Sequence, residues 1–561
     1  MTLLVNPVGN FPLNDDWVYG RAAQSIVVEK NFNLLGGNTS ANIITQAMWG
    51  AIFCLPFGFS FTALRISTLV LGLLGILATY ALLREAKVIP GLALLGSCLV
   101  MFNPIYFGLS YTYMTDIPFF AAASWSIYFL IRGIRRSSRN DTLFGILLSY
   151  VALLVRQNGI FISFAFAFAD IVQKKLSLKS LAQAFSPALL GLLIQFAYTK
   201  WLIVTHRTSP NLNLQVKGLL ETLATGDPKI ISAFIYFSLV ALVYLGVFTF
   251  LFTIIPFFNL SATNYSQKRR ALPIGLTILF SLLAGVCFLK GLKMPILALT
   301  EINRGHILEY FGLGPLTLHD TAILNINLPS IPGFLEVTWV FVTIAGIIGA
   351  TLLLYYAALA IWQIKQKKFQ NSELRYLKSQ LVFALALAIT YYAPLGVSGY
   401  FDRYLIFLIP VVMLFIAIAT SIHKELSLDS GNTLNQKAVF LIIAIILFFG
   451  GFTVGATHDY LAWNRTRWQA LNELITEYNV PINHIDGGYE FNGWYLYSPT
   501  DTDAINFRQK ANTNKSWWYV DRDDYIVTFG PLDQYEVLSQ YPLNNWLSFS
   551  PNHIFVLHKQ S

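Results

Sequence analysis

The sequence predicts an all-α polytopic membrane protein that carries a small soluble α/β domain at its C-terminal end. Three observations support this fold class. Of the 561 residues, 55% are hydrophobic and only 12% are charged, whereas soluble domains carry about 25% charged residues. Apolar runs long enough to cross a bilayer, about 20 residues each, recur along most of the chain. Residues 456–561 differ in composition, with short apolar stretches separated by polar segments rich in Trp and Tyr.

The apolar runs predict about twelve spans across a ~30 Å hydrocarbon core. We expect them at 62–83, 90–108, 117–131, 142–156, 159–173, 185–204, 231–256, 272–289, 335–362, 381–398, 404–422 and 438–455. Every second connection between them is short and basic, for example RGIRRSSR (132–139) and QIKQKKFQNSELRYLK (363–378). Short basic loops stay in the cytoplasm, so residues 1–61 and 456–561 are predicted to face outward. The net charge of +9 is therefore read as membrane topology, and no nucleic-acid partner is expected.

The predicted outward position of residues 1–61 raises a question of topology, because no signal peptide precedes them. A loop of this length normally needs an upstream helix to carry it across the membrane. We therefore expect a thirteenth helix encoded ahead of Met1; the alternative is an N-terminus that is translocated unaided.

Three regions follow from these patterns. Residues 1–61 form an outer loop with amphipathic helices at the membrane surface, and residues 62–455 form the membrane domain. Residues 456–561 form the soluble domain, which begins with an amphipathic helix at 463–480. Its strands are expected at 482–486, 524–530 and 553–559.

Three carboxylates lie on the predicted outer side. Asp15 and Asp16 stand in FPLNDDWVYG, and Asp116 stands in YTYMTDIPFF at the mouth of the third span. A carboxylate beside hydrocarbon is costly unless it is paired or used, so the three predict a functional site. The alternative is that each caps a helix, with Pro118 in the first turn after Asp116.

The acidic motif Asp15-Asp16-x-x-Tyr19 resembles that of the GT-C superfamily of integral-membrane glycosyltransferases. Its protein O-mannosyltransferases and lipid A aminoarabinose transferases carry Asp-Glu there, so Asp16 is a conservative departure. The likeness continues through LRISTLVLG (64–72), TDIP (115–118) and DRYLIFLIP (402–410), and it extends over residues 11–422.

The resemblance implies a GT-C-like fold in a bacterial inner membrane and an outward-facing active site. The expected reaction moves a hexosyl or pentosyl group from a polyprenyl phosphate to a hydroxyl of a lipid, glycan or protein acceptor. An acceptor hydroxyl needs a general base, which is assigned to Asp15. Asp16 would support the site and Asp116 would orient the acceptor or the base. Backside displacement would invert the anomeric carbon. No cofactor is expected, and a divalent metal is left open.

The leaving group of such a reaction is a lipid phosphate, which needs cationic hydrogen-bond donors. Outer-side candidates are Arg304, Arg403, Lys290, Lys293 and His306. The alternative for each is a side chain that extends to the membrane interface without contacting a ligand. Arg156, in the turn VRQNG, is expected to anchor its hairpin, with a place near the lipid phosphate as the second interpretation.

Two other classes of function stay open. A transporter or flippase of a lipid-linked glycan would line a path across the bilayer with charges. The few charges inside predicted spans, Arg65, Asp170 and Lys200, lie near span ends and favour an enzyme. A non-catalytic assembly partner would need no outer acid pair. The polar and aromatic residues of 484–499 suit sugar binding, but we expect them to form domain core.

Overall fold

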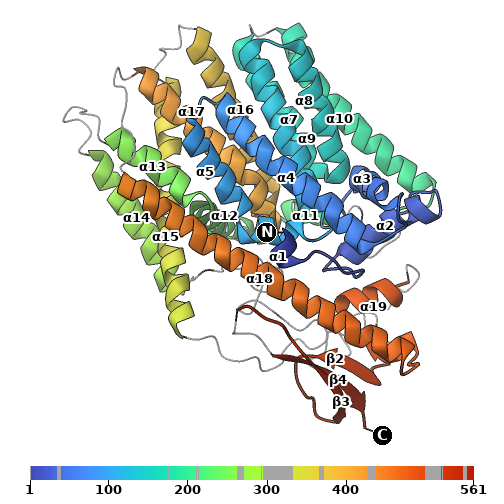
Figure 1. Cartoon of the computed structure of the whole chain (residues 1–561). Coiled ribbons are helices and arrows are strands. Elements are labelled where there is room, and N and C mark those ends of the chain that lie inside the picture. The colour runs from blue at the N-terminus through green and yellow to red at the C-terminus, as the bar shows by residue number, and fades with distance from the viewer. Residues whose placement is uncertain are drawn as a thin grey trace.

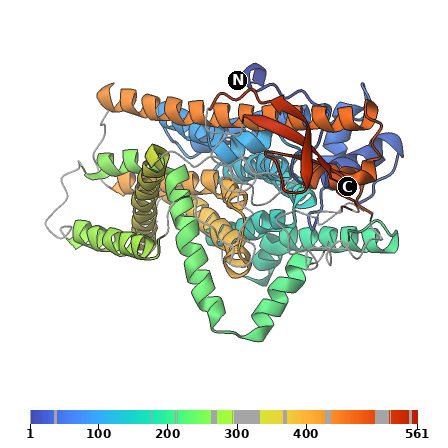
Figure 2. The ribbon, with the colours of Figure 1, turned by 90° about the horizontal axis from the view of Figure 1, so that it is seen from below.

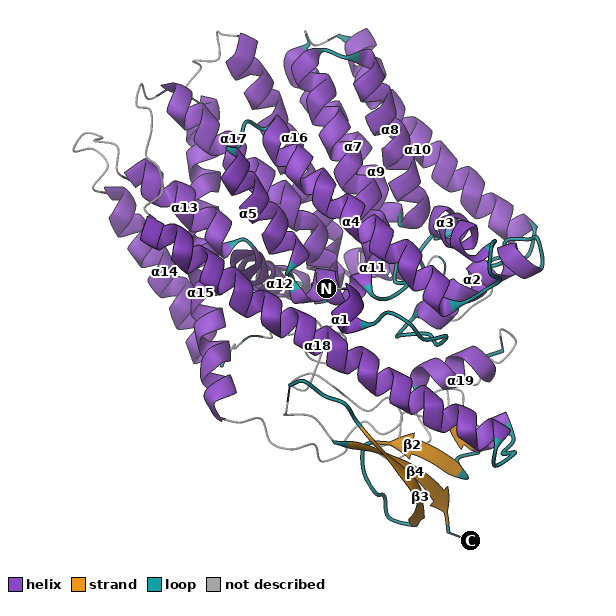
Figure 3. Cartoon of the chain, viewed as in Figure 1, coloured by secondary structure: helices purple, strands orange, loops and turns teal. Residues whose placement is uncertain are grey.

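The structure is a computed structural model of the chain (Figure 1). It describes residues 2–34, 39–174, 177–209, 212, 214–261, 271–291, 294, 333–365, 372–426, 436–498, 520, 522–547 and 552–560. Figure 3 shows that the bundle is helical and that the strands of these residues lie in the C-terminal part.

Eight helices among the described residues are long and apolar enough to cross a membrane. These spans lie in α4 (Phe61–Glu85), α7 (Asp116–Arg136), α10 (Leu178–Val204), α12 (Lys229–Phe248), α15 (Gly333–Lys365), α16 (Ser372–Ser398), η3 (Asp402–Phe407) with α17 (Leu408–Leu426), and α18 (Gln436–Thr476). The protein is an integral membrane protein, and the predicted all-α polytopic class is confirmed.

Other predicted spans correspond to further helices. The stretches predicted at 142–156, 159–173 and 272–289 are helical as α8 (Arg139–Val155), α9 (Ile160–Gln173) and α14 (Ala271–Leu289). The stretch predicted at 231–256 is divided between α12 and α13 (Phe250–Ser261). A ninth candidate span is the pair α5 (Pro90–Met101) and α6 (Pro104–Ser110), which bends by 64°. Two local features explain the bend. Pro104 disfavours a helical backbone at the preceding residue, Asn103, so α5 ends there. The Asn103 side chain then accepts hydrogen bonds from the backbone amides of Ile105 and Tyr106 and caps the start of α6. The count of about twelve spans stays a prediction.

Three of the predicted basic connections meet at one end of the bundle. Glu85, the last residue of α4, forms ion pairs with Arg135 (2.6 Å) and Arg136 (3.5 Å) at the end of α7. The hydroxyl of Ser137, which follows α7, lies 3.4 Å from that of Tyr376, a residue of α16 within the predicted basic stretch 363–378. These connections therefore share a side, as the charge alternation predicts.

The N-terminal segment is tied to the bundle by one buried arginine. It contains α1 (Thr2–Val5), α2 (Asp16–Val28) and α3 (Ile44–Cys54), and α3 packs beside α4 and α8 (Figure 1). Arg65 of α4 donates to the carbonyls of Pro7 (2.5 Å), Gly9 (3.2 Å) and Phe11 (3.0 Å). This clamp fixes the chain just ahead of Asp15 and Asp16. Two short helices, η1 (Gln157–Gly159) and α11 (Leu214–Thr225), complete the bundle.

The C-terminal unit follows α18 and packs along it, as Figure 2 shows. It comprises η4 (Ile482–His484), β1 (Ile485–Asp486), α19 (Tyr489–Tyr495), β2 (Tyr525–Thr528), β3 (Tyr535–Pro542) and β4 (His553–Lys559). The sheet order is β1-β2-β4-β3, with β1 parallel to β2 and the other pairs antiparallel. The strands expected at 524–530 and 553–559 are confirmed as β2 and β4. Of the strand expected at 482–486, only Ile485–Asp486 is a strand, and its first three residues form η4.

Two features of this unit differ from the sequence prediction. The span expected at 438–455 and the helix expected at 463–480 form one continuous helix, α18, because no proline or capping signal interrupts the chain between them. The edge strand β3 was not predicted: most of its residues are exposed and it carries a bulge between Val537 and Ser539, so it lacks an apolar signature.

Candidate active site

Asp15 and Asp16 stand at the start of α2. Asp15 occupies the N-cap position of this helix, but its side chain does not cap the helix. Among the described residues its side chain makes no capping hydrogen bond. Its Oδ1 accepts a hydrogen bond from the Tyr489 hydroxyl (2.8 Å), and its Oδ2 lies 3.6 Å from Nη2 of Arg403. The carboxylate therefore engages groups that are remote in sequence, and the capping alternative is wrong for this side chain.

Asp116 lies between two arginines in the first turn of α7. Its Oδ1 accepts a hydrogen bond from Nη1 of Arg156, and its Oδ2 lies 4.0 Å from Nε of Arg403. The Asp116 and Arg403 side chains are 2% and 9% exposed. We call Asp15, Asp116, Arg156 and Arg403 the acid–arginine cluster.

Two atoms of the acid–arginine cluster have unused hydrogen-bonding capacity. Oδ2 of Asp116 and Nε of Arg403 are buried, and neither has a hydrogen-bond partner among the described residues. A buried polar atom without a partner costs about 1–3 kcal/mol. A ligand with both donors and acceptors would satisfy the two atoms, which lie 4.0 Å apart and outside hydrogen-bond distance of each other.

Aromatic rings surround the two arginines. Tyr404 of η3 lies with its ring centroid 4.5 Å from Cζ of Arg156 and 5.7 Å from that of Arg403. The Phe401 ring lies 4.8 Å from Cζ of Arg403. Such cation–π contacts hold guanidinium groups while leaving their N–H groups free to bind anions. These two arginines come from the end of α8 and from η3, so the bundle fixes both.

Tyr19 follows Asp15 by one turn of α2 and is buried. Burial raises the pKa of its hydroxyl, and the nearby Asp15 acts in the same direction while Arg403 opposes it. The hydroxyl therefore stays protonated at physiological pH. It provides a neutral hydrogen-bond donor beside the acid–arginine cluster.

Asp16 points away from the acid–arginine cluster. Its Oδ1 accepts the backbone amide of Tyr113 (2.8 Å), and its Oδ2 accepts that of Leu13 (3.3 Å). Burial raises the pKa of Asp16 to about 8, while the Tyr113 amide and the charge of Arg65 partly offset this effect. Asp16 thus joins the N-terminal segment to the turn that leads into Asp116, and both oxygens are occupied by the protein itself.

The C-terminal unit reaches the same place through α19. Glu490 accepts the backbone amide of Asn14 (3.1 Å) and pairs with Arg467 of α18 (2.7 Å). Asn14 and Asp15 are therefore held by α19, and Asp16 is held by the turn before α7. In the stretch 484–499, Asp486 and Glu490 are buried, as expected for core residues. Trp494 is instead half-buried and stacks on Phe59 of the N-terminal segment, and Tyr495 is 42% exposed, so the prediction of domain core is wrong for these two residues.

Sequence reasoning missed two members of this arrangement. Arg156 was expected mainly to anchor a hairpin, whereas it pairs with Asp116. Its position between two apolar runs on the outer side was the available signal. Tyr489 gave no signal, because it lies 474 residues from Asp15 and is one of many tyrosines.

The other predicted phosphate-binding residues are not part of the acid–arginine cluster. Lys290 is exposed at the end of α14. Lys293, Arg304 and His306 lie outside the described residues. Within the described ranges, no group of three or more His, Cys, Asp or Glu residues could hold a metal ion.

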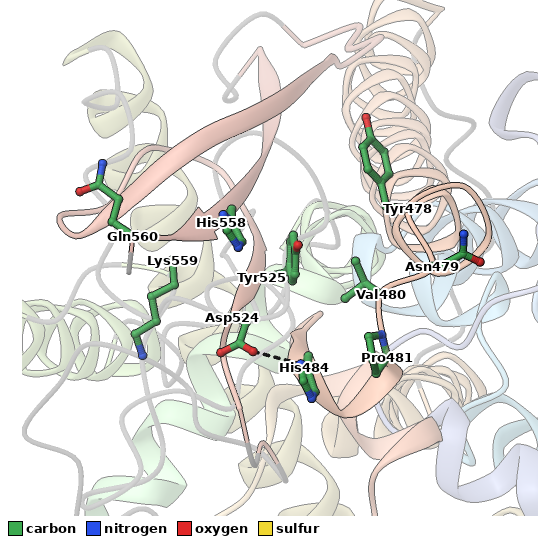
Figure 4. Close-up of a pocket in the computed structure, with 10 residues that line it drawn as sticks. All are labelled: Tyr478, Asn479, Val480, Pro481, His484, Asp524, Tyr525, His558, Lys559 and Gln560. Atoms are coloured by element: carbon green, nitrogen blue, oxygen red, sulfur yellow. Dashed lines mark ion pairs between the residues drawn. The ribbon is translucent and has the colours of Figure 1, made fainter.

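Two pockets lie outside the acid–arginine cluster itself. An apolar pocket of about 370 Å³ lies between α3, α4, α7 and α8. Its lining includes Pro118 and Val155, which are close in sequence to Asp116 and Arg156. A polar pocket of about 400 Å³ lies between the end of α18 and the sheet (Figure 4). His484 and Asp524 form an ion pair across it at 3.0 Å.

One stretch of the chain matches a known protein family. Residues 45–201, from α3 into α10, match a family model described as dolichyl-phosphate-mannose-protein mannosyltransferase. This range contains Asp116 and Arg156 but not Asp15 or Arg403. The match confirms the predicted resemblance to the GT-C superfamily of integral-membrane glycosyltransferases. No curated protein matches the chain.

Several solved structures align at low identity. The apo oligosaccharyltransferase of Archaeoglobus fulgidus is 17% identical with a TM-score of 0.37, and the alignment covers 87% of this chain but 57% of that one. ArnT from Cupriavidus metallidurans aligns over 99% of this chain and 96% of its own, with a TM-score of 0.39. Its identity is 10% in the structure bound to undecaprenyl phosphate and 11% in the apo structure.

Proposed function

We propose that the protein transfers a sugar from a polyprenyl-phosphate donor to an acceptor hydroxyl on the outer face of the membrane, with Asp15 as the general base. The observation that carries this proposal is the position of Arg403. Its guanidinium is buried, lies 3.6 Å and 4.0 Å from the carboxylates of Asp15 and Asp116, and has an unpartnered Nε. These separations are longer than a hydrogen bond, so an anion can compete for Arg403.

The charge balance of the acid–arginine cluster favours this competition. Its two acids and two arginines sum to zero, with Arg156 already hydrogen-bonded to Asp116. A phosphodiester that binds Arg403 would replace Asp15 as the anion that neutralises this arginine. The Asp15 carboxylate then becomes a stronger base as the donor arrives, and it takes the proton of the acceptor hydroxyl when that oxygen attacks the anomeric carbon.

The leaving phosphate stays on Arg403 as its second negative charge develops. A buried guanidinium stabilises this charge better than water does, because its donors are already oriented. Asp116, held by Arg156, has its Oδ2 free to accept a hydrogen bond from a sugar or acceptor hydroxyl. Displacement from the face opposite the phosphate inverts the anomeric configuration.

Two further observations support a lipid donor. The apolar pocket between α3, α4, α7 and α8 is lined by residues such as Trp49, Leu74 and Trp125 and suits a hydrocarbon chain. Its lining includes Pro118 and Val155, which are close in sequence to Asp116 and Arg156, so we infer that a chain lying there would extend toward the acid–arginine cluster. The family model matched by residues 45–201 is also described by a dolichyl-phosphate sugar.

Reconstitution in proteoliposomes tests the proposal directly. The vesicles would contain a polyprenyl-phosphate sugar labelled in the sugar, with membrane extract from cells lacking the gene as the acceptor source. We expect label to leave the donor fraction and appear in a new product. Label that changes leaflet while still attached to its lipid would indicate a flippase, and label that does neither would indicate an assembly partner.

A further inference from the structure

The C-terminal unit supplies one hydroxyl to the acid–arginine cluster. Tyr489, the first residue of α19, donates a hydrogen bond to Oδ1 of Asp15 at 2.8 Å. It is the one hydrogen bond that the Asp15 carboxylate accepts among the described residues. Oδ2 has the longer 3.6 Å separation from Arg403. With Oδ1 occupied, Oδ2 is the oxygen left to accept a proton.

Contacts that do not involve Asp15 hold Tyr489 in place. Arg21 of α2 donates to the carbonyls of Gly493 (3.2 Å), Trp494 (2.7 Å) and Tyr497 (3.4 Å), at the far end of α19. Glu490, next to Tyr489, is buried between the Asn14 amide and Arg467. The Tyr489 ring itself packs edge-on against Trp17 at 6.0 Å. Its hydroxyl is therefore positioned by the packing of α19 on α2.

We propose that Tyr489 is a positioning residue for the general base, so that the C-terminal unit completes the active site. This inference rests on the proposed function, which makes Asp15 the base. Asp15 is 26% exposed on its side chain, and a partly exposed carboxylate rotates among several rotamers. The Tyr489 hydroxyl selects the rotamer in which Oδ2 faces Arg403 and the space where the anomeric carbon must lie.

Tyr489→Phe tests this role, because it removes the hydroxyl and keeps the ring on Trp17. We expect kcat to fall about tenfold, since a hydrogen bond to a charged group is lost and Asp15 can then adopt other rotamers. The donor KM should stay at the parental value, because Arg403 is untouched. The matched control is Tyr535→Phe, which removes a hydroxyl that donates to the Asp523 carboxylate (2.9 Å) in the same unit and should leave kcat unchanged.

A second variant covers the case in which Tyr489→Phe folds poorly. Replacing Tyr489 by 3,5-difluorotyrosine keeps the ring and the donated hydrogen bond as long as the fluorinated hydroxyl is protonated. The kcat should therefore match the parental value at low pH and fall below it as the pH rises and the fluorinated hydroxyl loses its proton. Parental kcat at every pH for both variants would overturn the positioning role. A parental rate for Asp15→Asn would instead remove the proposed base, and that result is distinguishable because it does not depend on Tyr489.

Discussion

Asp15 and Asp16 are neighbours in the sequence, but they differ in burial and in hydrogen-bond partners. Asp16 is buried, and each of its oxygens accepts a backbone amide. Asp15 is partly exposed, has one hydrogen bond from a side chain and faces Arg403 at 3.6 Å. An acid whose hydrogen bonds are all made by the backbone stabilises a fold. An acid with an open oxygen opposite an arginine can take part in chemistry.

The same contrast separates the buried arginines. Arg65 donates to three backbone carbonyls, and Arg467 is paired with Glu490, so both fasten the N-terminal segment and α19 to the bundle. No hydrogen bond from the Arg403 guanidinium is found among the described residues, and it lies 3.6 Å and 4.0 Å from the carboxylates of Asp15 and Asp116. The structural network thus encloses the acid–arginine cluster and holds its open groups in place.

The largest effect that sharpens this contrast is expected from Arg403→Gln. Removing the charge should lower kcat/KM for the lipid donor about 100-fold, as expected for a buried charged partner, while the acceptor KM changes little. The matched variant is Arg467→Gln, which removes another buried guanidinium from the structural network. It should lower the thermal stability and leave the donor KM of the folded fraction unchanged. Equal donor kinetics in both variants would remove Arg403 from the site.

A smaller effect on rate is expected from Asp116→Asn. The amide keeps the size and one acceptor but loses the charge that pairs with Arg156. A loss of about tenfold in kcat is expected, in line with one hydrogen bond to a charged group. Steady-state kinetics at saturating donor measure it. A change in stability with parental kcat would show that Asp116 serves only to neutralise the arginines.

The smallest effect on rate, and a distinct effect on stability, is expected at Asp16. Burial raises the pKa of Asp16 from 3.8 to about 8, so the folded protein keeps a proton that the unfolded chain loses. This group therefore stabilises the fold most at low pH, and its contribution falls as the pH rises from 3.8 to about 8. Asp16→Asn cannot titrate. The parent Tm should fall more steeply than the Asp16→Asn Tm across this window; parallel curves would contradict the shift.

The sequence predicted much of this arrangement because its signals are local. The apolar runs identified the membrane spans. The basic loops predicted which connections lie on the same side of the bundle. The acids Asp15, Asp16 and Asp116 indicated the region of the site. The contacts that distinguish Asp15 from Asp16 are long-range. Tyr113, Arg403 and Tyr489 reach them across the fold, and no spacing in the chain encodes those pairings. Lys290 shows the converse, since a cation on the predicted outer side is exposed at the end of α14.

The most direct test of the account compares Asp15→Asn with Asp16→Asn as single-turnover rates per folded molecule, with donor bound. General-base catalysis contributes about 10²–10⁴-fold, so Asp15→Asn should lose at least 100-fold while still binding the donor. Asp16→Asn should lose far less, with its effect appearing in Tm. Asp15→Asn protein that transfers sugar at the parental rate, or an equal loss in the two variants, would contradict the assignment of Asp15 as the base.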